Sequence, residues 1–118
     1  MARLVLEFNT CRQAFIALGD ENRQHIIIAL LENYGGVRVG EITKRTNLSR
    51  PAVSHHLKVL KDAGIVSMFK KGTMNFYHID ANESQWRYLT SLIMHINDLV
   101  NEVSEKRKAG ICCHNIDE

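Results

Sequence analysis

Side chains suited to binding nucleic acid are concentrated between residues 47 and 66. Val53, Leu57 and Leu60 recur there at helical spacing and predict one buried stripe. The faces left to solvent carry hydrogen-bond donors and positive charges: Arg50, Ser54, His55, Lys58 and Lys61. Short or forked donors near the start of such a helix can reach base edges in a DNA groove, and lysines further along suit phosphates. The pattern predicts a DNA-recognition helix.

The two ends of this helix are marked by residue type. Ser49 can accept hydrogen bonds from free backbone N–H groups, and Pro51 falls in the first turn, where its missing donor costs nothing. Gly64 tolerates the left-handed conformation that ends helices. A hairpin is predicted to follow, with strands at 65–70 and 74–79 around a glycine turn.

Positive charge extends to both neighbours of this helix. A short helix at 39–46 is predicted to point Ile42 inward, and Lys70 and Lys71 stand at the hairpin tip. Residues 38–71 carry eight Lys or Arg and two acids, a net charge of +6, whereas the rest of the chain is −4. A solvated surface can carry such a bias by chance, but its coincidence with the motif favours DNA. The predicted DNA-binding residues are Lys44, Arg45, Ser49, Arg50, Ser54, His55, His56, Lys58, Lys61, Lys70 and Lys71. For His56, beside Leu57, a hydrogen-bonded structural imidazole is an equal alternative.

The remaining sequence predicts three further helices in a single domain. They cover residues 8–18, a core segment that begins after the N-cap residue Asp20, and residues 83–108. The last would span about 39 Å. Its apolar stripe could pack on its own core or on a second copy of the chain, and its length favours the second copy. The predicted dimer-interface residues are Phe8, Phe15, Leu89, Leu92, Ile93, Ile96, Leu99, Val100 and Val103.

These motifs resemble those of the ArsR/SmtB family of winged-helix repressors over roughly residues 10–104. The similarity is carried by residues 17–20 with Arg23, by residues 48–58, and by Gly64, Gly72 and Tyr77. It implies a mainly helical fold with a small β wing, a winged helix-turn-helix. We assign residues 1–108 to this domain and expect a flexible tail at 109–118. The resemblance also implies a homodimer built on the first and last helices. The implied activity is repression at an imperfect palindromic operator, relieved by an effector.

The sensor sites known in that family are incomplete in this sequence. The family's Cys-x-Cys pair is replaced by Arg38 and Gly40, which cannot bind a thiophilic metal. A second, zinc-type site is matched only partly, by residues out of register with the family pattern: Asp80, Glu83, His95 and Asp98.

Cysteines offer a different sensor hypothesis. Cys112, Cys113 and His114, with Cys11 from the first helix, could bind arsenite or a soft divalent metal through thiolates. Two alternatives stay open: Cys11 is a core residue beside a disordered tail, or Cys11 forms a redox-sensitive disulfide with the tail. A bridge between Cys112 and Cys113 themselves is disfavoured, because adjacent Cα atoms are only about 3.8 Å apart. No other cofactor is predicted.

Composition narrows the remaining classes of function. The 118 residues are 45% hydrophobic but contain no long apolar run or leader, so a cytoplasmic protein is expected, without membrane partners. No phosphate loop or catalytic constellation is present, which argues against an enzyme or a nucleotide substrate. A winged-helix module that binds another protein is the rival interpretation. The retained basic stripe argues against it.

Overall fold

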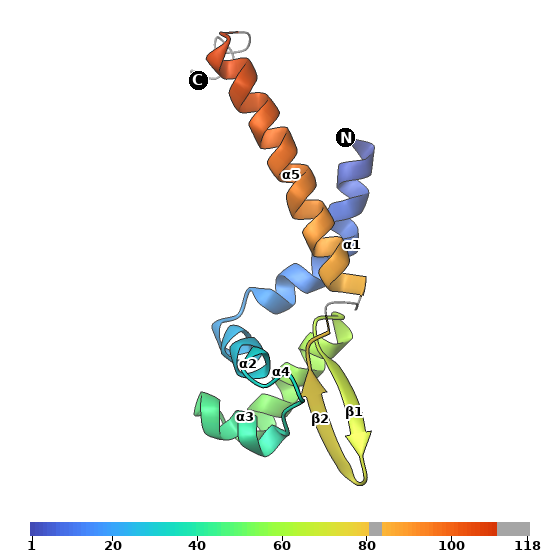
Figure 1. Ribbon diagram of the computed structural model, residues 1–118, viewed down its shortest axis with the longest axis vertical. Coiled ribbons are helices and arrows are strands. Elements are labelled where there is room, and N and C mark those ends of the chain that lie inside the picture. Colours follow the sequence, from blue (N-terminus) through green and yellow to red (C-terminus); the bar gives the residue numbers. More distant parts are fainter. Residues whose placement is uncertain (81–83, 111–118) are drawn as a thin grey trace.

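The protein consists of five helices and one β-hairpin over the residues that the computed structural model describes, 1–80 and 84–110. The elements are α1 (Ala2–Leu18), α2 (Glu21–Leu31), α3 (Val39–Thr46), α4 (Arg50–Asp62), β1 (Ser67–Lys71), β2 (Met74–His78) and α5 (Ser84–Lys108). Helices α2 to α4 and the hairpin form one end of the molecule, and α5 and the first half of α1 project from it (Figure 1). The predicted mainly helical fold with a β wing is confirmed. None of the described helices is long and apolar enough to cross a bilayer.

Helix α4 has the ends that its sequence predicts. The Ser49 hydroxyl accepts a hydrogen bond from the Ala52 N–H at 3.3 Å, and Pro51 lies in the first turn. Gly64 follows the helix with φ +76°, and a Cβ at this position would lie 2.6 Å from the Gln85 side chain. Both the backbone conformation and the close approach of α5 therefore require glycine.

A single apolar core joins the elements. The three residues of the α4 stripe, Val53, Leu57 and Leu60, have no exposed surface and belong to one buried apolar cluster with residues of every other helix. Trp86 of α5 donates its indole N–H to the Ile65 carbonyl at 2.8 Å, which ties the start of α5 to the segment after α4. The core thus fixes the orientation in which α4 presents its polar face.

The hairpin is shorter than its sequence suggests. Ile65 and Val66 are buried and direct their N–H groups to the Leu60 carbonyl at the end of α4, so β1 begins only at Ser67. Lys70 and Lys71 pair within the ladder, which leaves Gly72 and Thr73 as the turn. The predicted strand start at residue 65 is wrong, and so is the placement of Lys70 and Lys71 at the hairpin tip. The backbone N–H groups of Ile65 and Val66 cap the end of α4 and are therefore not free to pair in a strand.

Helices α1 and α5 also differ from their predicted forms. Helix α1 begins at Ala2 rather than residue 8, because Leu4 packs on the core and Glu7 bonds to His95 of α5 at 2.7 Å. Leu89 and Leu92, predicted to form the dimer interface, are buried in the core of their own protomer. Their predicted place in an intersubunit interface is therefore wrong. The apolar stripe of α5 packs on its own core near the start of the helix and is exposed only further along.

Candidate nucleic-acid interface

The exposed face of α4 carries most of the predicted DNA-binding side chains. Arg50, Ser54, His55, Lys58 and Lys61 are exposed, opposite the buried stripe. The Lys58 ammonium donates to Asp62 at 2.8 Å, and this hydrogen bond raises the pKa of Lys58. Lys58 is the one member of this set that forms an ion pair among the described residues, and the other four side chains face solvent without one.

The hairpin and α3 flank this face. Lys70 and Lys71 are exposed near the end of β1, and Lys44 is exposed on α3. Asn47, with φ +57°, turns the chain from α3 into α4, and Ser49 stands at the helix start. The three elements that carry these predicted cations, α3, α4 and the hairpin, lie at one end of the molecule (Figure 1).

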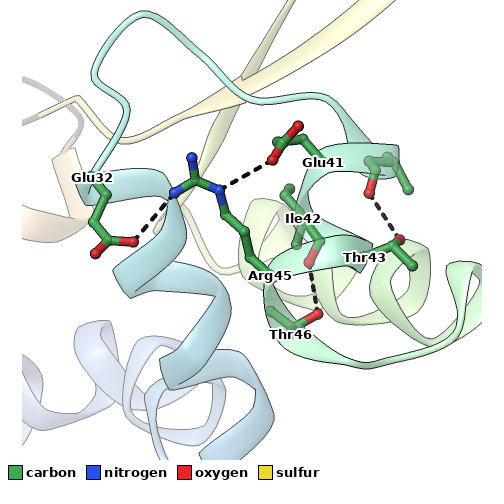
Figure 2. Close-up of polar contacts among 7 residues, drawn as sticks. Glu32, Glu41, Ile42, Thr43, Arg45 and Thr46 are labelled. Carbon is green, nitrogen blue, oxygen red and sulfur yellow. Dashed lines mark hydrogen bonds and ion pairs between the residues drawn. The ribbon is translucent and has the colours of Figure 1, made fainter.

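Arg45 is engaged differently from the other cations. Figure 2 shows its guanidinium between two carboxylates, with Nη1 3.3 Å from Glu32 Oε1 and Nε 3.4 Å from Glu41 Oε2. Glu32 lies beyond the end of α2, so the pair links that end of α2 to α3. Sequence alone offered no sign of this contact, because Glu32 is separated from Arg45 by the loop between the helices.

His56 faces the protein. Its Nδ1 lies 3.2 Å from Arg23 Nη1, and Arg23 also donates to the carbonyls of Ala17 and Ile16 at 2.8 and 3.3 Å. Since arginine only donates, His56 accepts with a neutral ring. Burial lowers the pKa of His56, and the Arg23 charge adds to this effect, although Asp20 opposes it. These contacts favour the structural interpretation of His56.

Acidification should destabilise the protein partly through His56. Its pKa is lowered in the folded chain, so the unfolded chain binds a proton at this site first, near the usual value of 6.5. The free energy of unfolding should therefore fall as the pH drops through that value. Urea titrations from pH 7.5 to 5.5 should show a smaller fall in His56→Gln, which still accepts from Arg23 but cannot ionise. Identical pH dependence in both proteins would contradict the assignment.

A basic groove lies between α3, the start of α4 and the hairpin, and no local sequence signal predicts it. It has a volume of about 560 Å³, and its polar lining residues are Arg38, Glu41, Lys44, Arg50, Thr73 and Asn75. In the sequence, Arg38 stands at a position where the family has a cysteine, and Thr73 and Asn75 carry no charge. Their convergence depends on the hairpin folding back toward α3. The backbone pairing of Val37 with Tyr77, at 2.8 Å in both directions, holds the hairpin there.

The predicted sensor residues do not form a site within the described residues. Cys11 is 1% exposed, and burial, with a smaller effect of Glu7, raises its pKa, so its thiol is protonated. His95 is hydrogen-bonded to Glu7. Both His95 and Asp98 line a groove of about 1000 Å³ between α1 and α5. No group of three His, Cys, Asp or Glu suited to a metal occurs in the described part of the chain. Glu83, Cys112, Cys113 and His114 lie outside it.

The exposed basic helix α4 is the second helix of a helix-turn-helix and is followed by a hairpin, an arrangement that defines a winged-helix DNA-binding protein. The pattern of the bacterial regulatory proteins of the arsR family matches residues 20–68. The chain belongs to this family, whose members named below are transcriptional regulators and not enzymes.

Three known proteins illustrate the relationship. An uncharacterized HTH-type transcriptional regulator of Methanocaldococcus jannaschii, MJ1325, is 41% identical over 73 residues, which are 62% of this chain and 81% of that protein. The transcriptional repressor SdpR of Bacillus subtilis is 34% identical over 71 residues, 60% of this chain and 77% of the repressor. The homodimeric winged helix-turn-helix domain Mb0332 of Mycobacterium bovis superposes with a TM-score of 0.62 at 26% identity, covering 86% of this chain and 91% of that domain.

Proposed function

We propose that this protein is a repressor that binds an imperfect palindromic operator as a homodimer. The observation that carries the proposal is the polar face of α4, whose donors point to solvent while its apolar stripe is buried. A helix of this kind enters the major groove with its first residues toward the bases, and the hairpin reaches the flanking backbone. The relative described as a repressor supports repression as the outcome.

The dimer is proposed from the apolar surface of α1 and α5. Phe8, Ile93, Val100 and Val103 are exposed on these helices, each by 45% or more. Phe8, Val100 and Val103 also line a shallow apolar groove of about 410 Å³ between the two helices. A second copy would cover this surface and space two α4 helices about 34–36 Å apart, one turn of DNA. The homodimeric relative from Mycobacterium bovis supports this arrangement.

The proposal is tested with the duplex upstream of the protein's own gene and a scrambled duplex of equal length. Fluorescence anisotropy should show tighter binding to the upstream duplex, and His55→Ala should reduce that preference by about fivefold or more, as the loss of a base contact does. In sedimentation velocity, Val100→Glu should be monomeric, and Lys106→Gln, altered far along α5, should remain dimeric. Equal affinity for the two duplexes would contradict operator recognition. Failure to bind either duplex would favour the protein-binding module.

An effector site is proposed on sequence grounds at Cys112, Cys113 and His114. Because Cys11 belongs to the core, we expect arsenite to release the operator from wild type and from Cys11→Ala, but not from a Cys112→Ser, Cys113→Ser variant. Release by an oxidant instead of arsenite, lost in the same double variant, would support redox sensing. A complex that ignores both reagents would contradict a thiol sensor.

A further inference from the structure

The basic groove contains three cations from two helices. Arg38 stands at the N-cap position of α3, Lys44 lies on the same helix, and Arg50 is the first residue of α4. None of the three has an ion-pair partner among the described residues. Thr73 and Asn75 of the hairpin close the opposite side and add neutral donors. The groove therefore offers charge and hydrogen bonds to an anion between the recognition helix and the wing.

Arg50 points into this groove. Its Nη1 lies 3.6 Å from the position that a Cβ on Gly40 would occupy, so the guanidinium reaches across to the first turn of α3. This placement differs from the base contact predicted for Arg50. A guanidinium that spans α3 and α4 at the edge of the recognition face is positioned for a phosphate, which it can hold with two hydrogen bonds.

One acid, Glu41, also lines the groove. Its carboxylate is turned to Arg45, which Glu32 holds from the opposite side (Figure 2). The side chain of Arg45 is only 35% exposed between these two carboxylates. An unpaired Glu41 would repel a phosphate entering beside it. Arg45 thus balances the one charge in the groove that opposes an anion.

We propose that the basic groove binds the DNA backbone through Arg38, Lys44 and Arg50, and that Arg45 is a positioning residue that neutralises Glu41 instead of contacting DNA. The inference rests on the proposed function, because the anion is a phosphate of the bound duplex. It assigns Arg38 to the interface and removes Arg45 from the set of direct contacts. Arg38 at the N-cap of α3 and Arg45 in its last turn are cations of the same type, and their different neighbours give them different roles.

Arg38 is tested by its effect on affinity and on salt dependence. At low salt, Arg38→Gln should weaken binding to operator and scrambled duplex alike, by at least about tenfold. The slope of log K against log salt should become shallower by about two in a dimer, one phosphate contact for each protomer. Lys106→Gln, which removes a cation at the far end of α5, should change neither quantity.

Arg45 is tested by a double-mutant cycle with Glu41. Arg45→Gln should weaken binding by about two- to fivefold in the wild-type background and hardly at all in Glu41→Gln. Glu41→Gln alone should change binding little, because Arg45 already neutralises the Glu41 carboxylate. Because both residues are exposed, circular dichroism should show that each variant folds like the wild type.

Two results would overturn the inference while leaving the proposed function intact. One is a wild-type affinity and salt slope in Arg38→Gln. The other is an equal loss for Arg45→Gln in both backgrounds, which would make Arg45 a direct contact. If the wild-type protein bound neither duplex at about 50 mM salt, the proposed function itself would fail.

Discussion

Raising the salt concentration from 50 to 200 mM should weaken the complex with the operator by roughly 10³- to 10⁵-fold. A dimer that neutralises about six to ten phosphates releases as many condensed counterions, and added salt reverses that gain. In the proposed dimer, the exposed cations of α4, the hairpin and the basic groove would supply contacts of this kind on each protomer. Anisotropy titrations at several concentrations of one salt measure the slope directly.

The hairpin lysines provide the matched comparison for this prediction. Lys70 and Lys71 are exposed on β1, so a Lys70→Gln, Lys71→Gln variant should fold normally. It should have a slope shallower by about three to four if both contact phosphates in each protomer. A wild-type affinity that is insensitive to salt would contradict the interface described above, because it would leave the cations without a role in binding.

Replacing Leu57 by alanine should lower the free energy of unfolding by about 2–5 kcal/mol. The Leu57 side chain has no exposed surface and lies at the centre of the α4 stripe, between Val53 and Leu60. Its truncation removes apolar burial and leaves a cavity that surrounding helices cannot fill completely. A loss of this size is a large part of the stability of a typical domain, about 5–15 kcal/mol.

Ser54→Ala is the control for Leu57→Ala, because Ser54 is exposed on the opposite face of the same helix. It should change the stability by no more than about 0.5 kcal/mol. Urea denaturation followed by circular dichroism measures both variants. Equal stabilities would show that the α4 stripe is not a core element, and the orientation of the recognition face would then be unsupported.

Local sequence signals predicted the recognition helix almost completely. Its N-cap at Ser49, its proline in the first turn and its glycine after the last turn act through nearest neighbours, and the spacing of its apolar residues sets the buried face. The short α3 has the predicted bounds as well. The same signals failed for the start of β1, where residues of strand composition cap the preceding helix instead.

The sequence by itself determined the class of protein: a capped, basic recognition helix on an apolar stripe, followed by a cationic hairpin. Only the tertiary structure decided what individual polar and apolar residues do. Residue type made Arg45 and His56 candidate DNA contacts, but Glu32 and Arg23 occupy their polar groups. Leu92 looked like an interface residue, but the core of its own protomer buries it. Residue type sets what a side chain can bind, whereas the partner that it meets depends on contacts between segments far apart in the chain, which no local pattern encodes.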